Sequence, residues 1–461
     1  MGDREVKTVP PVKKGQVVTL VVTDLASNGE GVGRYQGFTI FVPGTLPGEE
    51  VRARVISLQK SYARALATDV VRPAANRAAA ICSAYPACGG CQLQHLAYSD
   101  QLRFKQQVVE RALHHIGKLD GVEVLPTLGM EKPWAYRNKA QFPLAQRGKR
   151  LVAGFYAPRS HQVVEITTCP LQLPQANVAL KELLAAANEL GIPAYDEQTG
   201  EGFLRHLLVR SAVRTGELMV VVVARSAAIP RLPELTERLV AGVPGLTSLL
   251  LNVNPRRTNV ILGEEWHTLW GKPSITEYLG PYRFTISGAS FFQVNPTQTV
   301  KLYQKVVEFA ALTGIETVVD AYCGIGTISL FLAAKAKRVY GIEVVPSAVE
   351  DARLSARENG IENAEFYQGE VEEVLPRLVA AGVKPDVMVV DPPRQGCRSE
   401  VLLAMAAAMP ARIVYVSCNP ATLARDLGIL AQHGLSPRIA QPVDMFPQTY
   451  HVECVTWIQK K

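Results

Sequence analysis

The sequence lacks any long apolar run. No stretch of its 461 residues approaches the roughly 18 consecutive apolar residues that a membrane-spanning helix needs, which excludes a spanning protein. Residues 1–14 also lack the apolar core of a secretory signal, so we expect a cytoplasmic protein without membrane contact. With 48% hydrophobic and 20% charged residues, the composition excludes a disordered tail and a small disulfide-bonded scaffold. A chain of this length predicts about three domains.

Acidic residues are few in the first part of the chain. Residues 1–160 contain 22 Lys and Arg against 12 Asp and Glu, which gives a net charge of +10. Residues 161–461 contain 27 Lys and Arg against 30 Asp and Glu, which gives a net charge of −3. Such an excess predicts a polyanionic partner, because Lys and Arg displace condensed counterions from phosphates. The alternative is a solvated basic surface that binds no partner.

Residues 17–71 contain alternating β-branched segments separated by Gly and Pro, without an amphipathic helix, which predicts a small β-barrel. The segments VVTDLASNGEGVGR, FVPGTLPGEEVRARV and KSYARALATDVV resemble a TRAM domain, an OB-like barrel of RNA-modifying enzymes. The resemblance implies that RNA binds here. Phosphate contacts and stacking faces are then expected from Arg34, Tyr35, Arg52, Arg54, Lys60, Tyr62 and Arg64.

The periodicity divides the chain into a barrel over residues 1–74 and two further domains. Residues 92–120 have helical periodicity, and we expect this helix to pack on the C-terminal domain. Strand-like and helical segments then mix, which predicts a central α+β domain over residues 75–285. In residues 286–461, strands and helices alternate regularly, which predicts a doubly wound, Rossmann-like sheet.

Eight cysteines in a reducing compartment favour ligands, nucleophiles or core positions over disulfides. Three of them follow the spacing C-x5-C-x2-C, and a fourth lies far downstream. Such a set binds zinc or a [4Fe-4S] cluster; the single C-x2-C pair favours the cluster, and zinc stays the alternative beside plain core cysteines. The absence of C-x3-C-x2-C disfavours a radical enzyme that cleaves its cofactor. The predicted ligands are Cys82, Cys88, Cys91 and Cys169.

A third glycine is missing from the Gly-x-Gly turn that follows the strand-like segment VVDAY. Strand, turn and helix place backbone N–H groups beside a nucleotide-like ligand, but a dinucleotide dehydrogenase, the rival interpretation, usually needs glycine where Ser329 stands. Glu343, at the end of the next strand, is positioned to bind ribose hydroxyls. The pattern from Asp320 through Gly324 and Gly326 to Glu343 resembles the S-adenosylmethionine pocket of class I methyltransferases.

The next strand, VMVVD, ends at Asp391 and continues as Pro-Pro-Arg. The two prolines stiffen the backbone and hold Asp391 toward the mouth of the sheet. Many nucleobase N-methyltransferases have Asn-Pro-Pro and an aromatic residue here. Since this sequence lacks both the Asn and the aromatic residue, methylation of an exocyclic amine is disfavoured, and a simple turn after a strand is the alternative.

The strand IVYVS leads to Cys418, directly before a helix that follows Asn419 and Pro420. A thiol at a helix N-terminus lies in a positive potential, which predicts a lowered pKa and a reactive thiolate. Glu453 lies in the strand-like segment HVECV of the same domain. A core position for Cys418 and a surface ion pair for Glu453 are the alternatives.

Six motifs, FFQVN, DAYCGIGT, GIE, DPPR, SCNP and HVE, are together similar to the RNA uracil-5-methyltransferase family. With the barrel and the four cysteines, the chain resembles the 23S ribosomal RNA branch of that family, which implies RNA, S-adenosylmethionine and a structural [4Fe-4S] cluster. The resemblance implies Cys418 as the nucleophile on uracil C6 and Glu453 as the base at C5. The implied cofactor-binding residues are Gln293, Tyr322, Gly324, Gly326, Glu343 and Asp391.

Three other functions stay open from the sequence. The nearest is the same chemistry on a tRNA uridine, although bacterial tRNA-specific relatives generally lack both the barrel and the cysteines. The second is an RNA-binding protein without catalysis. The third is a cytosine-5 methyltransferase, which normally has a second cysteine near the Asp-Pro strand end, whereas Cys397 follows a glycine. In each case we expect a monomer.

Overall fold

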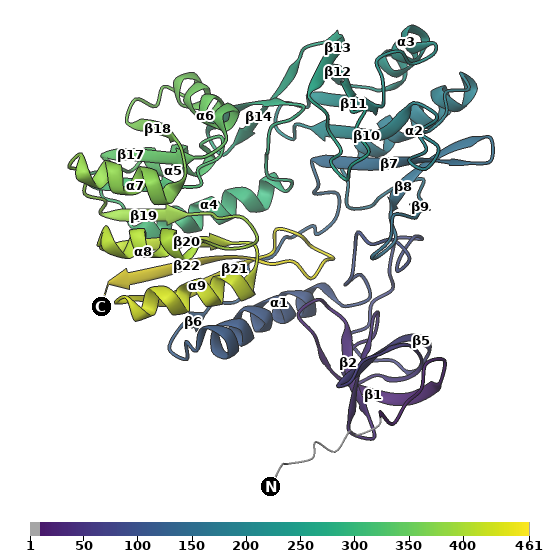
Figure 1. The fold of residues 1–461 in the computed structure, drawn as a ribbon, viewed down its shortest axis with the longest axis horizontal. Helices are drawn as coiled ribbons and strands as arrows, with labels where there is room; N and C mark the ends of the chain where they lie inside the picture. Colours follow the sequence, from purple (N-terminus) through teal and green to yellow (C-terminus); the bar gives the residue numbers. More distant parts are fainter. Residues whose placement is uncertain (1–9, 461) are drawn as a thin grey trace.

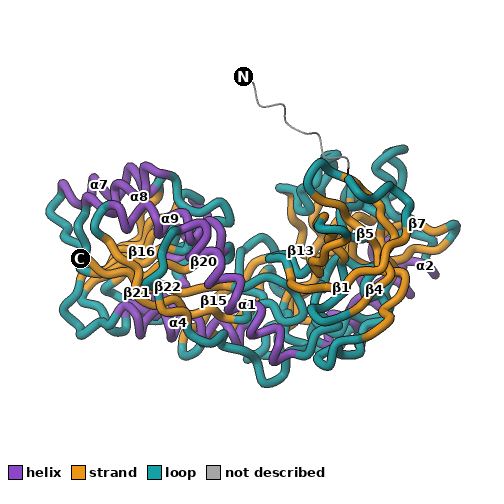
Figure 2. Tube along the Cα trace, turned by 90° about the horizontal axis from the view of Figure 1, so that it is seen from below, coloured by secondary structure: helices purple, strands orange, loops and turns teal. Residues whose placement is uncertain are grey.

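The computed structural model describes residues 10–460 and contains a small barrel, a central mixed sheet and a C-terminal sheet (Figure 1). The first nine residues of the predicted barrel domain lie outside the described residues. In Figure 2 the C-terminal sheet lies on one side of the molecule, and the central sheet and the barrel lie on the other. No helix within residues 10–460 is long and apolar enough to cross a membrane.

The N-terminal strands close into a five-stranded barrel in the order β1-β2-β3-β5-β4, which confirms the predicted barrel. Side chains alternate between the inside and the outside, so Val18, Leu20 and Val22 are buried while Val17 and Val21 are exposed. The strands are β1 (Val17–Leu25), β2 (Gly31–Tyr35), β3 (Phe38–Val42), β4 (Glu50–Leu58) and β5 (Tyr62–Arg72).

The central sheet has seven strands in the order β13-β12-β11-β10-β7-β8-β9, of which only the β11–β12 pair is parallel. The helices α2 (Pro174–Glu189) and α3 (Leu232–Gly242) pack against one face. The strands are β7 (Lys139–Arg147), β8 (Arg150–Tyr156), β9 (Val163–Glu165), β10 (Leu204–Ser211), β11 (Leu218–Ala224), β12 (Leu246–Val253) and β13 (Glu265–Gly271).

A hairpin of β14 (Ser274–Leu279) and β15 (Tyr282–Ser287) connects the two larger sheets. Its apolar side chains belong to one core that also contains residues of β10–β12 and of the C-terminal sheet. The predicted domain boundary between residues 285 and 286 falls within β15. The domain boundaries stay a prediction, because packing is continuous through this hairpin.

The C-terminal sheet has eight strands in the order β18-β17-β16-β19-β20-β22-β21-β6. The strands from β18 to β20 are parallel, and β22 is antiparallel to β20. The order reverses between β16 and β19, and sheets of this kind bind ligands at the carboxyl ends of the strands at such a point. The strands are β16 (Thr317–Ala321), β17 (Arg338–Glu343), β18 (Ala364–Gln368), β19 (Val387–Val390), β20 (Arg412–Ser417), β21 (Leu435–Val443) and β22 (Glu453–Lys460).

Helices cover both faces of this sheet, which confirms the predicted doubly wound arrangement. Strand side chains alternate between two cores, so Val318 joins the first and Val319 the second. The first core contains α4 (Pro296–Ala310), α5 (Thr327–Ala333) and α6 (Pro346–Glu358). The second contains α7 (Val371–Ala380), α8 (Ser399–Ala407), α9 (Pro420–Gln432) and the end of α1 (Tyr98–Ala112).

The helix α1 precedes the central sheet in sequence but packs on the C-terminal sheet. It contacts α9 and β21, and a π-helical turn (Leu113–Gly117) leads on to β6 (Glu123–Val124), which pairs with β21. Figure 1 shows α1 running from the barrel along the edge of that sheet. The helix begins later than the predicted residue 92, because the Ala97 backbone N–H, which would donate to the Leu93 carbonyl in such a helix, donates to the Asn76 carbonyl instead.

Candidate active site

A cavity of about 1020 Å³ lies at the carboxyl ends of β16 and β19. Its wall combines the glycine turn after β16, the turn after β19, the residue after β20 and the first residue of β22. Of the eight predicted catalytic and cofactor-binding residues, seven line it and are thus brought together around one space: Gln293, Tyr322, Gly324, Glu343, Asp391, Cys418 and Glu453.

The turn after β16 is formed by residues with positive φ. The angle is +65° at Tyr322, +53° at Gly324 and +79° at Gly326. A Cβ atom at Gly326 would lie 3.2 Å from Ala352 and Phe366, so this glycine allows close packing and does not itself line the cavity. A Cβ atom at Gly324 would meet nothing within 4 Å, because this residue faces the cavity.

Two carboxyl groups hold the glycine turn in place. The Glu343 carboxylate accepts hydrogen bonds from the backbone N–H groups of Gly324 (3.1 Å) and Val345 (2.9 Å). Asp320 is buried in β16 and accepts a hydrogen bond from the Ser329 hydroxyl (2.5 Å), and burial raises the pKa of Asp320 to about 7. The serine that replaces a third glycine therefore connects α5 to the strand.

The segment that carries Gln293, between β15 and α4, is held by the central sheet. Asn138 donates from Nδ2 to the Gln293 carbonyl (3.0 Å). Arg210 of β10 donates to the carbonyls of Gly288 (3.2 Å) and Ser290, and burial lowers the pKa of this guanidinium to about 10. The central sheet therefore shapes one wall of the cavity.

Cys418 is half-buried and lies directly before α9, where the Asn419 side chain caps the helix by accepting from the Ala421 N–H. Burial and the carboxyl groups of Glu453 and Asp391 raise the pKa of Cys418 to about 11, and Arg394 counteracts this. The lowered pKa predicted from the sequence is wrong. Desolvation is the largest cause of the rise, and two acidic neighbours from other strands add to it.

Glu453 and Asp391 are two carboxyl groups with different acidities in the same cavity. Glu453, 5% exposed, has its pKa raised to about 8 by burial and by Asp391, while Arg394 counteracts the rise. Burial raises the pKa of Asp391 to about 6. At neutral pH, Asp391 is therefore mainly ionised and Glu453 mainly protonated.

The loop between β21 and β22 contributes two residues to which the sequence assigned no role. Phe446 and His451 line the cavity, and the His451 ring contacts the rings of Phe446 and Tyr450. Burial lowers the pKa of His451 to about 4, so the imidazole is neutral. His451 belongs to the HVE motif, whereas no pattern in the sequence singles out Phe446.

A second cavity of about 340 Å³ shares Arg394, Phe446 and His451 with the first. Burial raises the pKa of Cys91 to about 12 and also raises that of Cys169. Within residues 10–460, no three His, Cys, Asp or Glu side chains form a group that could hold a metal ion. The cavity is nevertheless lined by all four predicted ligands, Cys82, Cys88, Cys91 and Cys169, none of which forms a disulfide.

Cys397 is absent from the wall of the reaction cavity. It is buried in the core, where its sulfur accepts a hydrogen bond from the Tyr415 hydroxyl (3.5 Å) and its backbone N–H donates to Asp426 (2.8 Å). The only observation that pointed to a cytosine-5 methyltransferase was the proximity of this cysteine in sequence. Its position in the core removes that support.

Comparison with known proteins identifies the family. A sequence profile described as tRNA (Uracil-5-)-methyltransferase matches residues 276–461. An uncharacterized RNA methyltransferase of Clostridium tetani is 48% identical over 445 residues, which cover 96% of this chain and 96% of that protein. The chain belongs to the RNA uracil-5-methyltransferase family.

Similarity to other uracil-5-methyltransferase relatives extends over the whole chain. A TRAM domain profile matches residues 11–68. An uncharacterized RNA methyltransferase of Halalkalibacterium halodurans is 47% identical over 455 residues, 99% of each chain. The crystal structure of the Pyrococcus abyssi tRNA (uracil-54, C5)-methyltransferase in complex with S-adenosyl-L-homocysteine superposes with a TM-score of 0.77 and 31% identity, covering 95% of this chain and 99% of that one. The two proteins therefore share the fold along nearly their full length.

Proposed function

We propose that this uracil-5-methyltransferase transfers a methyl group from S-adenosylmethionine to C5 of a uridine in 23S ribosomal RNA, through a covalent adduct with Cys418. The observation that carries the proposal is the single cavity shared by the Cys418 thiol, the Glu453 carboxyl group and the glycine turn. Methylation at C5 requires a nucleophile, a base and a methyl donor within one space. The same arrangement argues against an RNA-binding protein without catalysis.

The residues around the glycine turn fit S-adenosylmethionine, which supplies the methyl group. Gly324 exposes its backbone to the cavity, and Glu343 lies at the end of the adjacent strand, where a carboxylate binds ribose hydroxyls. Asp391 is negatively charged at neutral pH, which favours a cationic sulfonium nearby. Gln293 and Tyr322 complete the proposed donor pocket. The S-adenosyl-L-homocysteine in the Pyrococcus structure supports this choice of donor.

The proposed chemistry follows from the weak nucleophilicity of uracil C5. The Cys418 thiolate bonds to C6, and the electron pair of the C5–C6 double bond moves onto C5 as an enolate, which takes the methyl group as the methyl–sulfur bond of the donor breaks and S-adenosylhomocysteine leaves. The ionised form of Glu453, a minority at neutral pH, then accepts the C5 proton, and the electron pair of that C–H bond reforms the C5–C6 double bond as the C6–S bond breaks and releases Cys418 as a thiolate. Since the Cys418 pKa is about 11, the thiol must give its proton to water as it adds, and it regains one from water after it is released. The Arg394 charge lowers the pKa of both Cys418 and Glu453.

The barrel and the basic excess of residues 1–160 support RNA as the substrate. Within a stacked helix, C5 and C6 of a uracil are not accessible to a thiol in a cavity. The target uridine is therefore flipped out of the helix or lies in a single-stranded segment.

The four-cysteine cavity is the proposed site of a [4Fe-4S] cluster. Such a cluster binds each cysteine at a different iron atom, so its ligands stand farther apart than the ligands of a single ion. The support for this proposal is that all four thiols line one cavity, although the described residues form no group of three side chains that could hold a metal ion. The cluster would fix the Cys82–Cys91 turn to the segment at Cys169, and no catalytic step uses it.

A tRNA uridine is the second candidate substrate, favoured by the Pyrococcus tRNA enzyme. Because that enzyme aligns with 95% of this chain, the barrel alone does not separate the two substrates, and the choice of 23S ribosomal RNA depends on the cysteine set. The test incubates the full chain with methyl-labelled donor and, separately, 23S ribosomal RNA and tRNA from cells that lack the protein. We expect labelled 5-methyluridine in the ribosomal RNA only. Label in tRNA alone would establish the second candidate, and label in neither would refute both.

A further inference from the structure

The loop between β21 and β22, residues 444–452, carries Phe446 and His451 into the reaction cavity and leads directly to Glu453. Most of this loop is buried, and Gln448 has a φ of +70°, which is strained for a residue other than glycine. Such a conformation persists only where surrounding contacts impose it.

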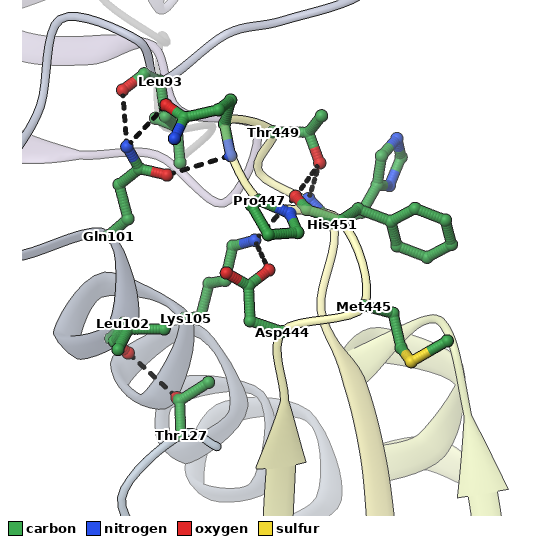
Figure 3. A network of polar contacts seen from close by, with 12 residues as sticks. Leu93, Gln101, Leu102, Lys105, Thr127, Asp444, Met445, Pro447, Thr449 and His451 are labelled. Atoms are coloured by element: carbon green, nitrogen blue, oxygen red, sulfur yellow. Dashed lines mark hydrogen bonds and ion pairs between the residues drawn. The ribbon is translucent and has the colours of Figure 1, made fainter. Parts of the chain in front are cut away.

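Figure 3 shows the side chains of Gln101 and Lys105, both on α1, pointing into this loop. Lys105 is fully buried, and its ammonium group donates to Asp444 Oδ1 (2.5 Å) and to the Phe446 carbonyl (3.0 Å). The Tyr98 hydroxyl donates to the other carboxylate oxygen of Asp444 (2.8 Å). Burial lowers the pKa of Lys105, and the Asp444 carboxylate counteracts this. These contacts fix the first part of the loop.

Gln101, one turn before Lys105 on α1, holds the strained residue itself. Its side-chain carbonyl accepts from the Gln448 backbone N–H (3.0 Å), and its amide nitrogen donates to the Gln448 side-chain oxygen (3.0 Å). The backbone N–H groups of Gln92 and Leu93 donate to the Gln448 carbonyl (3.0 Å each). The N–H, the C=O and the side chain of Gln448 are therefore all bound by α1 or by the segment before it.

These contacts contribute more to the orientation of the loop than to the free energy of unfolding. A buried ion pair contributes little net stability, because desolvation of two charges offsets their attraction. Lys105 and Asp444 are both 0% exposed, and within residues 10–460 Lys105 is the one basic side chain that pairs with Asp444. The helix α1 lies outside the residues 276–461 matched by the methyltransferase profile. The charge of Asp444, in the loop of residues 444–452, is therefore neutralised by a residue of the N-terminal half.

We propose that Lys105 and Gln101 are positioning residues that hold residues 444–452 so that Phe446, His451 and Glu453 face the reaction cavity. The proposal rests on the proposed function, in which Glu453 must meet the C5 proton. A displacement of about 1 Å at a reacting group lowers a rate by about 100-fold. Release of the loop should therefore slow proton removal more than it weakens binding of the methyl donor, whose proposed pocket lies on other segments.

The test compares the full wild-type chain with Lys105→Met, with the double variant Lys105→Met/Asp444→Leu and with a control, Glu277→Gln. The single variant leaves Asp444 buried without its cation, whereas the double variant removes both charges at similar volume and should fold. Glu277 is also fully buried, but it accepts from the backbone N–H groups of Val213 and Arg214 and does not line the reaction cavity.

For the double variant we expect affinity for S-adenosyl-L-homocysteine within about twofold of wild type and a kcat lowered by about tenfold or more. The covalent RNA–enzyme complex should accumulate, because proton removal is the slowed step. The Glu277→Gln control should keep the wild-type kcat. A double variant with wild-type kcat, or one that loses kcat and affinity for S-adenosyl-L-homocysteine in equal proportion, overturns the proposal.

Hydrogen exchange separates the failure of this proposal from the failure of the proposed function. In the double variant, amides of residues 444–452 should exchange faster while those of β16 and β20 stay unchanged. Unchanged exchange in the loop overturns the positioning role even in an enzyme that methylates uridine. If the loop of the double variant exchanges faster but the wild-type chain forms no 5-methyluridine, the positioning role is supported and only the proposed function is refuted.

Discussion

The buried carboxyl group of Glu453 should make the protein less stable as the pH rises. Its pKa is raised from the ordinary value of 4.5 to about 8 in the folded chain. Below pH 4.5 the group is protonated in both states, and above it the unfolded chain ionises first. The contribution of protonated Glu453 to the free energy of unfolding is therefore fully present below pH 4.5, and it is lost as the pH rises from 4.5 through 8. Glu453→Gln places a neutral side chain of the same shape at this site and removes the loss.

The magnitude follows from the difference between the two pKa values. Each pKa unit corresponds to about 1.4 kcal/mol, so Glu453→Gln should stabilise the protein by about 1.5 kcal/mol near pH 5.5. The gain should be about 3 kcal/mol larger at pH 8 than near pH 5.5. Asp391, whose pKa is about 6, titrates in both proteins and largely cancels in the comparison.

The assay is urea unfolding at the two pH values, with hydrogen exchange of the β20 and β22 amides as the signal of the C-terminal sheet. Glu362→Gln, which changes an exposed carboxyl group of the same domain, is the control for the loss of a carboxyl group outside the cavity. The more stable Glu453→Gln protein should also form no 5-methyluridine. A gain in stability that is equal at both pH values would refute the protonation state assigned to Glu453.

Three further predictions concern other residues. Arg394→Gln removes the charge that lowers the pKa of Cys418 and Glu453, so the pH profile of single-turnover methylation should shift to higher pH; an unshifted profile would contradict this. Cys169→Ser should lower the iron content of anaerobically purified protein, measured per chain, and equal iron in both proteins would exclude Cys169 as a ligand. Arg52→Gln/Arg54→Gln removes two exposed charges of β4, and the slope of log affinity for RNA against log salt should fall by about 1.5; an unchanged slope would place the RNA elsewhere.

The fold followed from the sequence where the pattern was periodic. The alternating strands of residues 17–71 and the regular strand–helix alternation after residue 286 predicted the barrel and the doubly wound sheet, because both patterns reflect which side chains are buried. The packing of α1 on the C-terminal sheet was expected, but the first residue of this helix, Tyr98, was not. The Ala97 N–H donates to the Asn76 carbonyl, outside the periodic segment, and local periodicity carries no information about such a contact.

Short sequence motifs predicted which residues form the candidate site, but they did not predict the acidity of those residues. The motifs predicted seven residues that line one cavity, because six of them stand at or near the ends of strands of the same sheet, while Gln293 comes from the segment between β15 and α4. The acidity of Cys418 could not be predicted, since its pKa depends on burial and on Glu453 and Asp391, which come from other strands. Phe446 and Lys105 also escaped notice, because their importance comes from contacts between α1 and a distant loop.

The central claim is that Cys418 bonds to C6 of a uridine. The most direct measurement incubates the full chain and S-adenosylmethionine with target RNA that carries 5-fluorouridine, followed by mass spectrometry of the trapped complex. Fluorine at C5 cannot leave as a proton, so Glu453 has nothing to remove and the C6–S bond persists. We predict a stable adduct on one uridine, attached to the peptide that contains Cys418 and absent from Cys418→Ala. An adduct on another cysteine or on cytidine, or methylation without any adduct, would contradict the mechanism.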